Sequence, residues 1–218
     1  MDAPAFCRVT GGNVRSVADS PADRTADTRV PIHPPIAARW SPRAFDPDAV
    51  VDTEQLTALL EAARWAPTWG HRQPVRFVVG VRRDPTFARL SGLLRRGNSY
   101  ANAAGALILV CADEGEDERT ALYSGVDAGA AMAGLIIEAV ARGLIAHPMA
   151  GFDVEGARQA FALDAGLRPL MIIAVGSLAD YAEVPEEVAE RDRRPRERLP
   201  LEQIVLNDWS WYEDNGIT

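Results

Sequence analysis

The chain has 218 residues, 47% of them hydrophobic and 25% charged, so length and composition fit one globular domain. Its net charge of −8 argues against nucleic acid as the main partner, because binding to phosphates needs a basic face. No run reaches the roughly 18 apolar residues that cross a membrane, and no apolar core of a signal peptide is present, so we expect a cytoplasmic protein that binds no membrane.

The first 35 residues are polar, rich in turns and without clear periodicity, so we expect residues 1–35 to form a flexible segment. A single domain over residues 36–218 should follow. In chain order, its sequence predicts a helix over Thr53–Trp65, a strand over Val75–Val81, a short helix over Pro85–Arg95 and a strand over Ala106–Ala112. The acidic run Asp113–Glu118 is interpreted as a surface loop.

The longest predicted helix covers Ser124–Arg142 and is apolar around most of its circumference. Such a helix is buried on most sides, either against a sheet or against a partner subunit. A short extended piece over Ile145–Pro148, a helix over Val154–Leu163 and a strand over Leu170–Val175 follow. Strands and helices do not alternate regularly, so we expect an α+β or three-layer fold around a mixed sheet.

The residue types present exclude several kinds of site. All 23 basic residues are arginine, which rules out the lysine of a Walker phosphate loop and a lysine Schiff base. Cys7 and Cys111 form no zinc or disulfide pattern, and the histidines form no HExxH motif, so we expect no metal. The glycine-rich run 125–134 is not GxGxxG and is interpreted as small-residue helix packing.

The first segment with chemical character is Arg39-Trp40-Ser41-Pro42-Arg43. If it is extended, its alternate residues lie on one side, and Pro42 favours this by moving Ser41 away from helical geometry. Alternatively, Ser41 caps a helix with Pro42 at the first position, where free N–H groups suit an anion. In both cases two guanidinium groups and a hydroxyl can converge on a phosphate.

Three further segments have polar or small residues where an element ends. The loop from Ala66 to Pro74 has hydrogen-bonding side chains held between prolines, and such loops commonly contact ligands. These side chains are those of Thr68, His71 and Gln73. The segment Pro148–Gly151 lies between the long predicted helix and the next one, and its small residues let a backbone approach a flat ring. Arg196 and Arg198 form a late arginine pair. Taken singly, each segment also fits an ordinary turn, connection or solvated charged run.

Together and in this order, the four segments resemble those of the FMN-dependent nitroreductase superfamily, over residues 36–209. The stretch from Arg39 to Phe45 is similar to that family's opening RxSxR signature, which an aromatic residue follows. The stretch from Ala66 to Pro74 is similar to its APSxxNxQPW loop. Pro148–Phe152 resembles its segment beside the flavin ring, and the late arginines resemble its basic pair.

The resemblance implies a three-layer α/β/α fold with a mixed, mainly antiparallel sheet and a long central helix. It also implies a homodimer with FMN at the subunit interface and exchanged terminal segments. The residues implied to hold the FMN phosphate are Arg39, Ser41, Arg43, Arg196 and Arg198. Those implied to contact the ribityl chain or the ring, some from the second subunit, are Thr68, His71 and Gln73. Those whose backbone is implied to face the ring are Pro148, Met149, Ala150 and Gly151.

Three positions depart from the family's pattern. His71 stands where asparagine is usual, and a histidine can become charged. Val75 replaces the usual tryptophan, which alters contacts to the ring. Ala150 occupies a position that is acidic in many members, which alters the tuning of the flavin.

The implied activity is that of an oxidoreductase in which NAD(P)H and then a small-molecule electron acceptor react by a ping-pong mechanism. The acceptor is a nitroaromatic compound, a quinone or another metabolite. Because the flavin carries the chemistry, no catalytic side chain is expected. Two alternatives are another flavin reaction of the superfamily, such as dehalogenation or dehydrogenation, and a non-catalytic FMN-binding or storage protein. An interaction protein without a ligand is the third.

Overall fold

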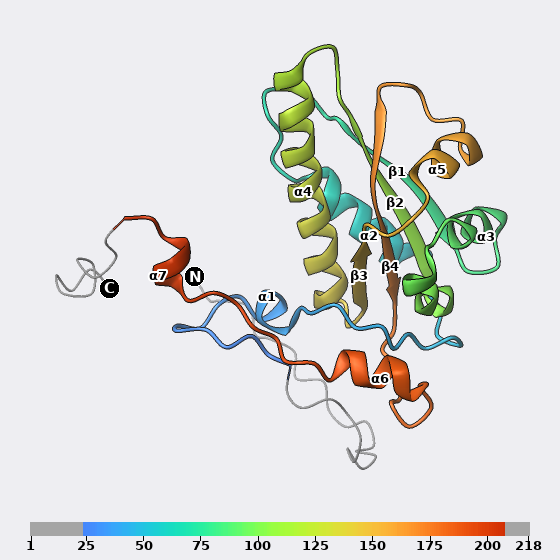
Figure 1. Cartoon of the computed structure of the whole chain (residues 1–218), viewed down its shortest axis with the longest axis vertical. Coiled ribbons are helices and arrows are strands. Elements are labelled where there is room, and N and C mark those ends of the chain that lie inside the picture. Colours follow the sequence, from blue (N-terminus) through green and yellow to red (C-terminus); the bar gives the residue numbers. More distant parts are fainter. Residues whose placement is uncertain (1–23, 208–218) are drawn as a thin grey trace, which may run out of the picture.

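A computed structural model describes residues 24–207 of the chain (Figure 1). Most of the expected N-terminal segment and the aromatic residues of the C-terminal end therefore lie outside the described residues. The described part of the N-terminal segment contacts the rest of the chain. The amide of Ala26 donates to the carbonyl of Ala37 (2.9 Å), and Arg24 Nη2 donates to the carbonyl of Arg194 (2.8 Å).

A four-stranded sheet forms the middle layer, in the order β1 (Val75–Val81), β2 (Ala106–Asp113), β4 (Leu167–Gly176) and β3 (Ile145–Met149). All three pairings between these strands are antiparallel. Residues 106–112 of β2 are completely buried, because both faces of this strand are covered. The expected α+β fold with a mainly antiparallel sheet is confirmed.

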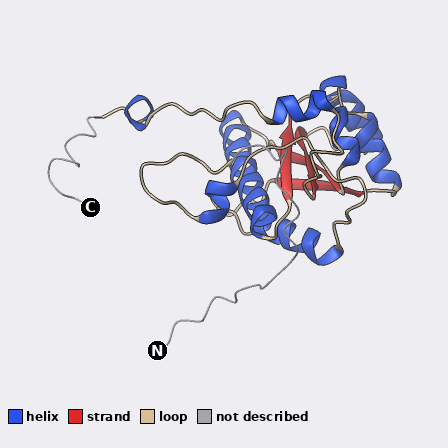
Figure 2. Ribbon diagram, turned by 90° about the horizontal axis from the view of Figure 1, so that it is seen from below, coloured by secondary structure: helices blue, strands red, loops and turns tan. Residues whose placement is uncertain are grey.

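Helices cover both faces of the sheet (Figure 2). On one face lie α2 (Thr53–Arg64) and α4 (Glu118–Ala141). On the other lie α3 (Pro85–Gly92), the 3-10 helix η1 (Arg96–Ala103) and α5 (Val154–Ala160). Two separate cores result, one on each face of the sheet. The first contains Leu59, Ile108 and Leu135, and the second contains Leu90, Leu109 and Phe152. This is the expected three-layer arrangement.

The long helix α4 begins earlier than its apolar pattern predicts. The carboxylate of Asp117 accepts the amide of Thr120 (3.0 Å) and caps the helix, so the polar residues before Ser124 form its first turns. The expected surface loop therefore ends at Asp117. Farther along, a Cβ at Gly134 would lie 2.8 Å from the carbonyl oxygen of Ala62, so close packing of α4 on α2 needs glycine at this position of the run 125–134, whereas Gly129 has open space around its Cβ.

The outer side of α4 has an exposed apolar stripe. Leu122 is 65% exposed and Val126 is 59% exposed, one helical turn apart. By length and composition α4 could cross a membrane, but its inner side is buried against the sheet and α2, as in the core helix of a globular protein. The structure therefore leaves one side of this helix without a partner among the described residues.

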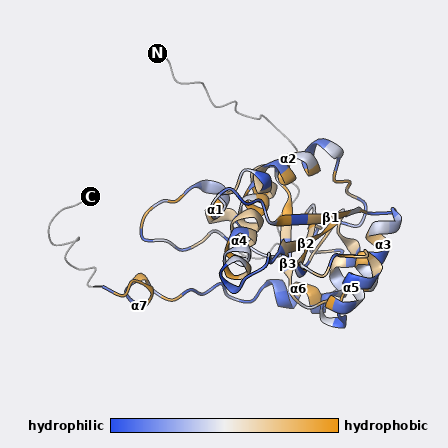
Figure 3. Cartoon of the chain, turned by 90° about the horizontal axis from the view of Figure 1, so that it is seen from above, coloured by the Kyte–Doolittle hydropathy of each residue, from blue (hydrophilic) through white to orange (hydrophobic). Residues whose placement is uncertain are grey.

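Three short helices lie outside the layers. The first, α1 (Pro34–Ala38), packs near α4, and α6 (Glu186–Asp192) lies below the sheet in Figure 1. A small third core around Ala44, Tyr181 and Ala189 attaches α6 to the body. Beyond α6 the chain forms an arm, residues 193–207, that extends away from the body and contains the helical turn α7 (Leu201–Ile204), as Figure 3 shows.

Candidate functional site

The segment Arg39–Ala44 is extended. Helix α1 ends at Ala38, and Arg39 has the extended angles φ −65° and ψ 125°. The alternative in which Ser41 caps a helix is therefore wrong. Within the segment, Arg39 Nη1 lies 3.4 Å from Ser41 Oγ, to which it donates. The first arginine and the serine of the RxSxR pattern thus lie together, as the extended interpretation predicts.

Arginines from three parts of the chain meet at this point. Arg196 donates through Nη2 to the carbonyl of Arg39 (2.8 Å) and through Nη1 to the carbonyl of Arg24. We call Arg24, Arg39, Arg196 and Arg198 the arginine cluster. Burial lowers the pKa of Arg196, and the charges of the other three lower it further. Burial and the charge of Arg198 likewise lower the pKa of Arg39.

No carboxylate within residues 24–207 pairs with Arg39, Arg196 or Arg198. The described ion pairs involve other arginines, among them Arg43. Guanidinium groups that repel one another and have no acidic partner favour an anion, and a phosphate satisfies them best through charged hydrogen bonds. The cluster thus has the chemistry of a phosphate site.

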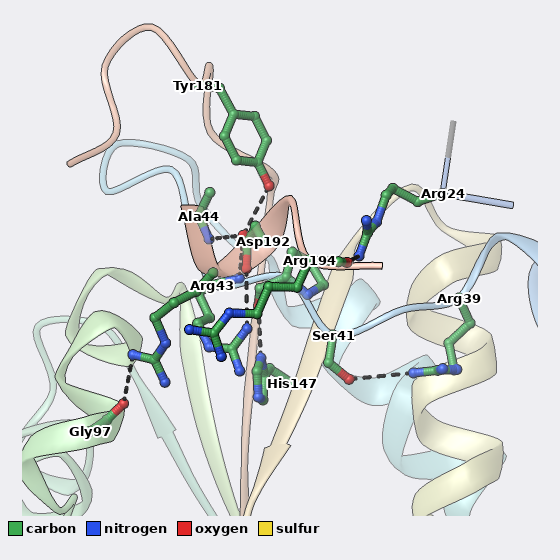
Figure 4. A network of polar contacts seen from close by, with 12 residues as sticks. Arg24, Arg39, Ser41, Arg43, Ala44, Gly97, His147, Tyr181, Asp192 and Arg194 are labelled. Atoms are coloured by element: carbon green, nitrogen blue, oxygen red, sulfur yellow. Dashed lines mark hydrogen bonds and ion pairs between the residues drawn. The ribbon is translucent and has the colours of Figure 1, made fainter. Parts of the chain in front are cut away.

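Arg43 faces a different partner from Arg39 (Figure 4). Its amide donates to Asp192 Oδ2 (2.8 Å), and its Nη1 lies 3.3 Å from Asp192 Oδ1. Asp192 also accepts the amide of Ala44 (3.1 Å) and the hydroxyl of Tyr181 (2.9 Å), and its side chain is completely buried. The structure therefore brings Arg39, Ser41, Arg196 and Arg198 together and directs Arg43 toward Asp192.

His147 holds the same segment from the side of the sheet. Its Nδ1 lies 2.9 Å from the carbonyl of Pro42, and a carbonyl only accepts, so Nδ1 carries the proton. Burial lowers the pKa of His147, which is therefore neutral near pH 7. The ring packs at 5.1 Å from that of Tyr100.

Pro148 and Arg39 line a common cavity of about 410 Å³. Its other walls are apolar and come from α1, α4 and β4. They are formed by Ile36, Gly129, Met132, Ala133, Ile136, Ile137 and Met171. A flat apolar ring fits such walls, with its polar end toward Arg39.

The residues after Pro148 have different surroundings. Met149 belongs to the core on the other face of the sheet, so only its backbone is available to a ligand beside Pro148. Ala150 is exposed. Gly151 accepts hydrogen bonds from Asn98 Nδ2 (2.8 Å) and from the amide of Arg95 (3.1 Å). A Cβ on Gly151 would lie 2.7 Å from Asn98 Nδ2, so the missing side chain makes room for this asparagine.

The loop that contains Thr68, His71 and Gln73 lies beside the N-terminal half of α4. The amide of Trp69 donates to Asp127 (2.9 Å), and its ring stacks on Tyr123 at 4.8 Å. The cavity, in contrast, borders residues 129–137 of the same helix. No contact among the described residues joins the three polar side chains to the arginine cluster, and His71 and Gln73 are exposed.

Sequence reasoning missed three residues of this region, namely Arg24, His147 and Asp192. Nothing in the polar stretch around Arg24 marks it. Asp192 had a weak signal, because Val188, Ala189 and Asp192 repeat at helical spacing and indicate a helix with one inward face. Within the described ranges, no three His, Cys, Asp or Glu side chains lie close enough to hold a metal ion.

Comparisons with known proteins identify the class. The sequence pattern of the Nitroreductase family matches residues 36–104 and 88–177. The chain belongs to this family, which is a family of oxidoreductases. The expectation based on the four short segments is thereby confirmed.

Individual relatives agree. An uncharacterized 15.4 kDa protein of Mycolicibacterium smegmatis is 64% identical over 140 residues, which cover 61% of this chain and 95% of that protein. A Streptomyces coelicolor protein, named as an NADH dehydrogenase/NAD(P)H nitroreductase, is 32% identical over 59% of this chain and 74% of its own length.

Solved structures share the fold. A crystal structure of an oxidoreductase containing FMN superposes with a TM-score of 0.76 at 30% identity, covering 83% of this chain and 93% of that one. A nitroreductase of Desulfovibrio desulfuricans in complex with FMN superposes with a TM-score of 0.66 at 28% identity, covering 82% and 98%.

Proposed function

We propose that the protein is an FMN-dependent NAD(P)H oxidoreductase whose arginine cluster holds the phosphate of FMN. The observation that carries the proposal is the meeting of Arg39, Arg196 and Arg198 without a described carboxylate partner. The FMN phosphate has a charge of about −1.5 to −2 near neutral pH, which several arginines suit. Ser41 adds a hydroxyl beside Arg39. Arg43, which pairs with Asp192, acts by holding this segment in place.

The isoalloxazine ring occupies the cavity between Pro148 and α4. Arg39 lines that cavity and also belongs to the arginine cluster. A ligand whose ring and phosphate are joined by a short chain therefore places its ring in the cavity and its phosphate at the cluster. Pro148 supplies its side chain, and Met149, Ala150 and Gly151 supply backbone. FMN, when bound, supplies two-electron redox chemistry, so the protein's own residues bind and orient it, and no catalytic side chain is required.

The protein acts as a homodimer with FMN at the interface. The exposed stripe of Leu122 and Val126 supports this arrangement, because neighbouring apolar side chains on an exposed helix surface favour an interface. Thr68, His71 and Gln73 lie away from the arginine cluster of their own chain, so they contact the FMN held by the second subunit. The arm of residues 193–207 reaches out from the body (Figure 1). We expect it to cross onto that subunit.

Donor and acceptor use the same site in turn, in a ping-pong reaction. NAD(P)H is the hydride donor, and a nitroaromatic compound, a quinone or a related small metabolite is the acceptor. Residues 36–218 form the one domain required, and the net charge of −8 suits a cytoplasmic enzyme without a nucleic-acid or membrane partner.

The visible spectrum of the purified protein tests the proposal. We expect a protein that is yellow as purified, or that keeps the yellow colour after excess FMN is removed, and this colour should bleach with NADH or NADPH without oxygen. Failure to bind FMN would overturn the proposal. A yellow protein that neither nucleotide bleaches would support FMN storage instead. Acceptors offered to the photoreduced protein distinguish reduction of nitroaromatics or quinones from reductive dehalogenation, and a substrate of dehydrogenation would instead bleach the oxidised protein.

A further inference from the structure

Two chain segments contact each other in opposite directions at one end of the sheet, below it in Figure 1. One goes from Ala44 back to Arg39, and the other goes from Asp192 forward to Arg196. At one end, Asp192 accepts the amides of Arg43 and Ala44. At the other end, Arg196 donates to the carbonyl of Arg39. Three residues separate Arg39 from Arg43 and three separate Asp192 from Arg196, so the first connection limits how the arginines at the second can move.

The contacts of Asp192 hold the two segments in a fixed position relative to each other. The carboxylate is completely buried and receives four donors: two amides, the hydroxyl of Tyr181 and the guanidinium of Arg43. Asp192 is also the last residue of α6, so its bonds determine where the arm leaves that helix. A buried carboxylate with several donors has one geometry, because any displacement leaves a donor or the charge unsatisfied.

Asp192 cannot itself attract a phosphate, because both are negative. Its effect on an anion at the arginine cluster must pass through the two segments that it joins. We propose that Asp192 is a positioning residue that holds Arg39 and Arg196 at the separation required by the phosphate of FMN. This inference rests on the proposed function.

The test compares two flavins that differ only in the phosphate, FMN and riboflavin. Asp192→Asn preserves the size of the side chain but turns one acceptor oxygen into an NH2 group that faces donors. We expect the dissociation constant for FMN to rise about tenfold, in the range for disturbing charged hydrogen bonds. The dissociation constant for riboflavin should stay within about twofold, because no contact of the ring changes.

A matched control exists on the same helix. Glu186 forms an exposed ion pair with Arg193 (2.6 Å) near the beginning of α6. Glu186→Gln removes the negative charge of this pair and leaves the contacts of Asp192 in place, so both dissociation constants should equal those of the wild type. Melting temperatures of all variants without flavin report any loss of stability separately.

The possible results distinguish a failure of the proposed function from a failure of the inference about Asp192. A wild type that does not bind FMN overturns the proposed function. If the wild type binds and Asp192→Asn keeps the wild-type ratio of FMN to riboflavin affinity, even with a lower melting temperature, Asp192 is only structural. If Asp192→Asn does not fold, Tyr181→Phe removes one donor and preserves the ring. The ratio should then fall about threefold, and an unchanged ratio overturns the inference.

Discussion

Two buried polar residues hold the stretch Pro42–Ala44, and they differ in charge. His147 donates to the carbonyl of Pro42, whereas Asp192 accepts from Arg43 and Ala44. The carboxylate neutralises Arg43. Burial lowers the pKa of His147, with Arg43 and Arg191 acting in the same direction, whereas Asp192 and the bond to Pro42 oppose them. The positive charge available to a ligand therefore comes from the arginine cluster.

The lowered pKa of His147 predicts a dependence of stability on acid. Below its ordinary pKa of 6.5 the unfolded chain takes up a proton that the folded chain does not, so the free energy of unfolding falls. This contribution is fully present above about pH 6.5 and decreases toward the lower folded pKa. The slope from one histidine is at most about 1.4 kcal/mol per pH unit.

Urea unfolding of the flavin-free protein between pH 5 and pH 8 measures this slope. His147→Gln should flatten the part of the curve below about pH 6.5. His33 is exposed, so His33→Gln should keep the wild-type curve. A wild-type slope in the His147 variant would show that other groups cause the acid sensitivity.

Arg24 should strengthen the binding of FMN although it lies outside the signature segments. Its guanidinium stacks on Trp40 at 4.7 Å, and its charge contributes to lowering the pKa of Arg196. Arg24→Gln should weaken FMN about fivefold at low salt, or about 1 kcal/mol. The difference should shrink at high salt, because ions screen the charge.

A titration of FMN fluorescence at two salt concentrations measures the effect of Arg24. Arg64→Gln is the control, since Arg64 pairs with Glu61 on the exposed side of α2. Equal FMN affinity of the Arg24 variant and the wild type at low salt would exclude Arg24 from the phosphate site.

At the scale of the elements, the sheet and the long helix were predictable because their residues have strong local patterns. Residues 106–112 are apolar without interruption and form the central strand. The boundaries depended on weaker signals. Asp117 caps α4 and so extends it, and α3 stops at Gly92. The last predicted residues of α3 instead form a turn and a bridge from Leu94 to Phe152, and η1 begins only at Arg96.

The candidate site was only partly predictable, for a physical reason. Family-like spacing identified Arg39, Ser41 and Arg196, which the structure brings together. The sequence did not identify Asp192 as the partner of Arg43, because the two residues are 149 positions apart and Asp192 lies in a charged stretch that predicts exposed surface. Long-range pairing of this kind leaves no local pattern.

The contact of α4 with α2 depends on the missing side chain of Gly134. A methyl group there would meet the carbonyl of Ala62 at 2.8 Å, so the helices must separate. Gly134→Ala should lower the free energy of unfolding by about 1–3 kcal/mol, despite the better helix propensity of alanine. Chemical denaturation measures this change in the free energy of unfolding. Gly92→Ala, with open space around the Cβ, should be neutral or stabilising by up to about 1 kcal/mol, and equal effects of the two would contradict this packing argument.

At the scale of the whole molecule, exposed apolar side chains lie on surfaces that the rest of the described chain does not cover. The stripe of Leu122 and Val126 runs along α4, and Leu199 and Ile204 are exposed on the arm. The cavity beside Pro148 opens between α1 and the same helix α4. A second subunit packed against α4 would cover the stripe and bring its own loop of residues 66–74 toward this cavity. Assembly and FMN binding are then one event.

A charged residue on this stripe should therefore disrupt both the assembly of the dimer and the binding of FMN. In a symmetric dimer, Val126→Asp buries a carboxylate without a partner in each subunit, at a cost of several kcal/mol. We expect a monomer in sedimentation velocity at micromolar concentration and an FMN affinity at least about tenfold weaker. Thr57→Asp places the same charge on the exposed side of α2 and should leave both properties unchanged. A monomeric Val126 variant with wild-type FMN affinity would mean that one chain holds the flavin alone, and that Thr68, His71 and Gln73 have no part in binding it.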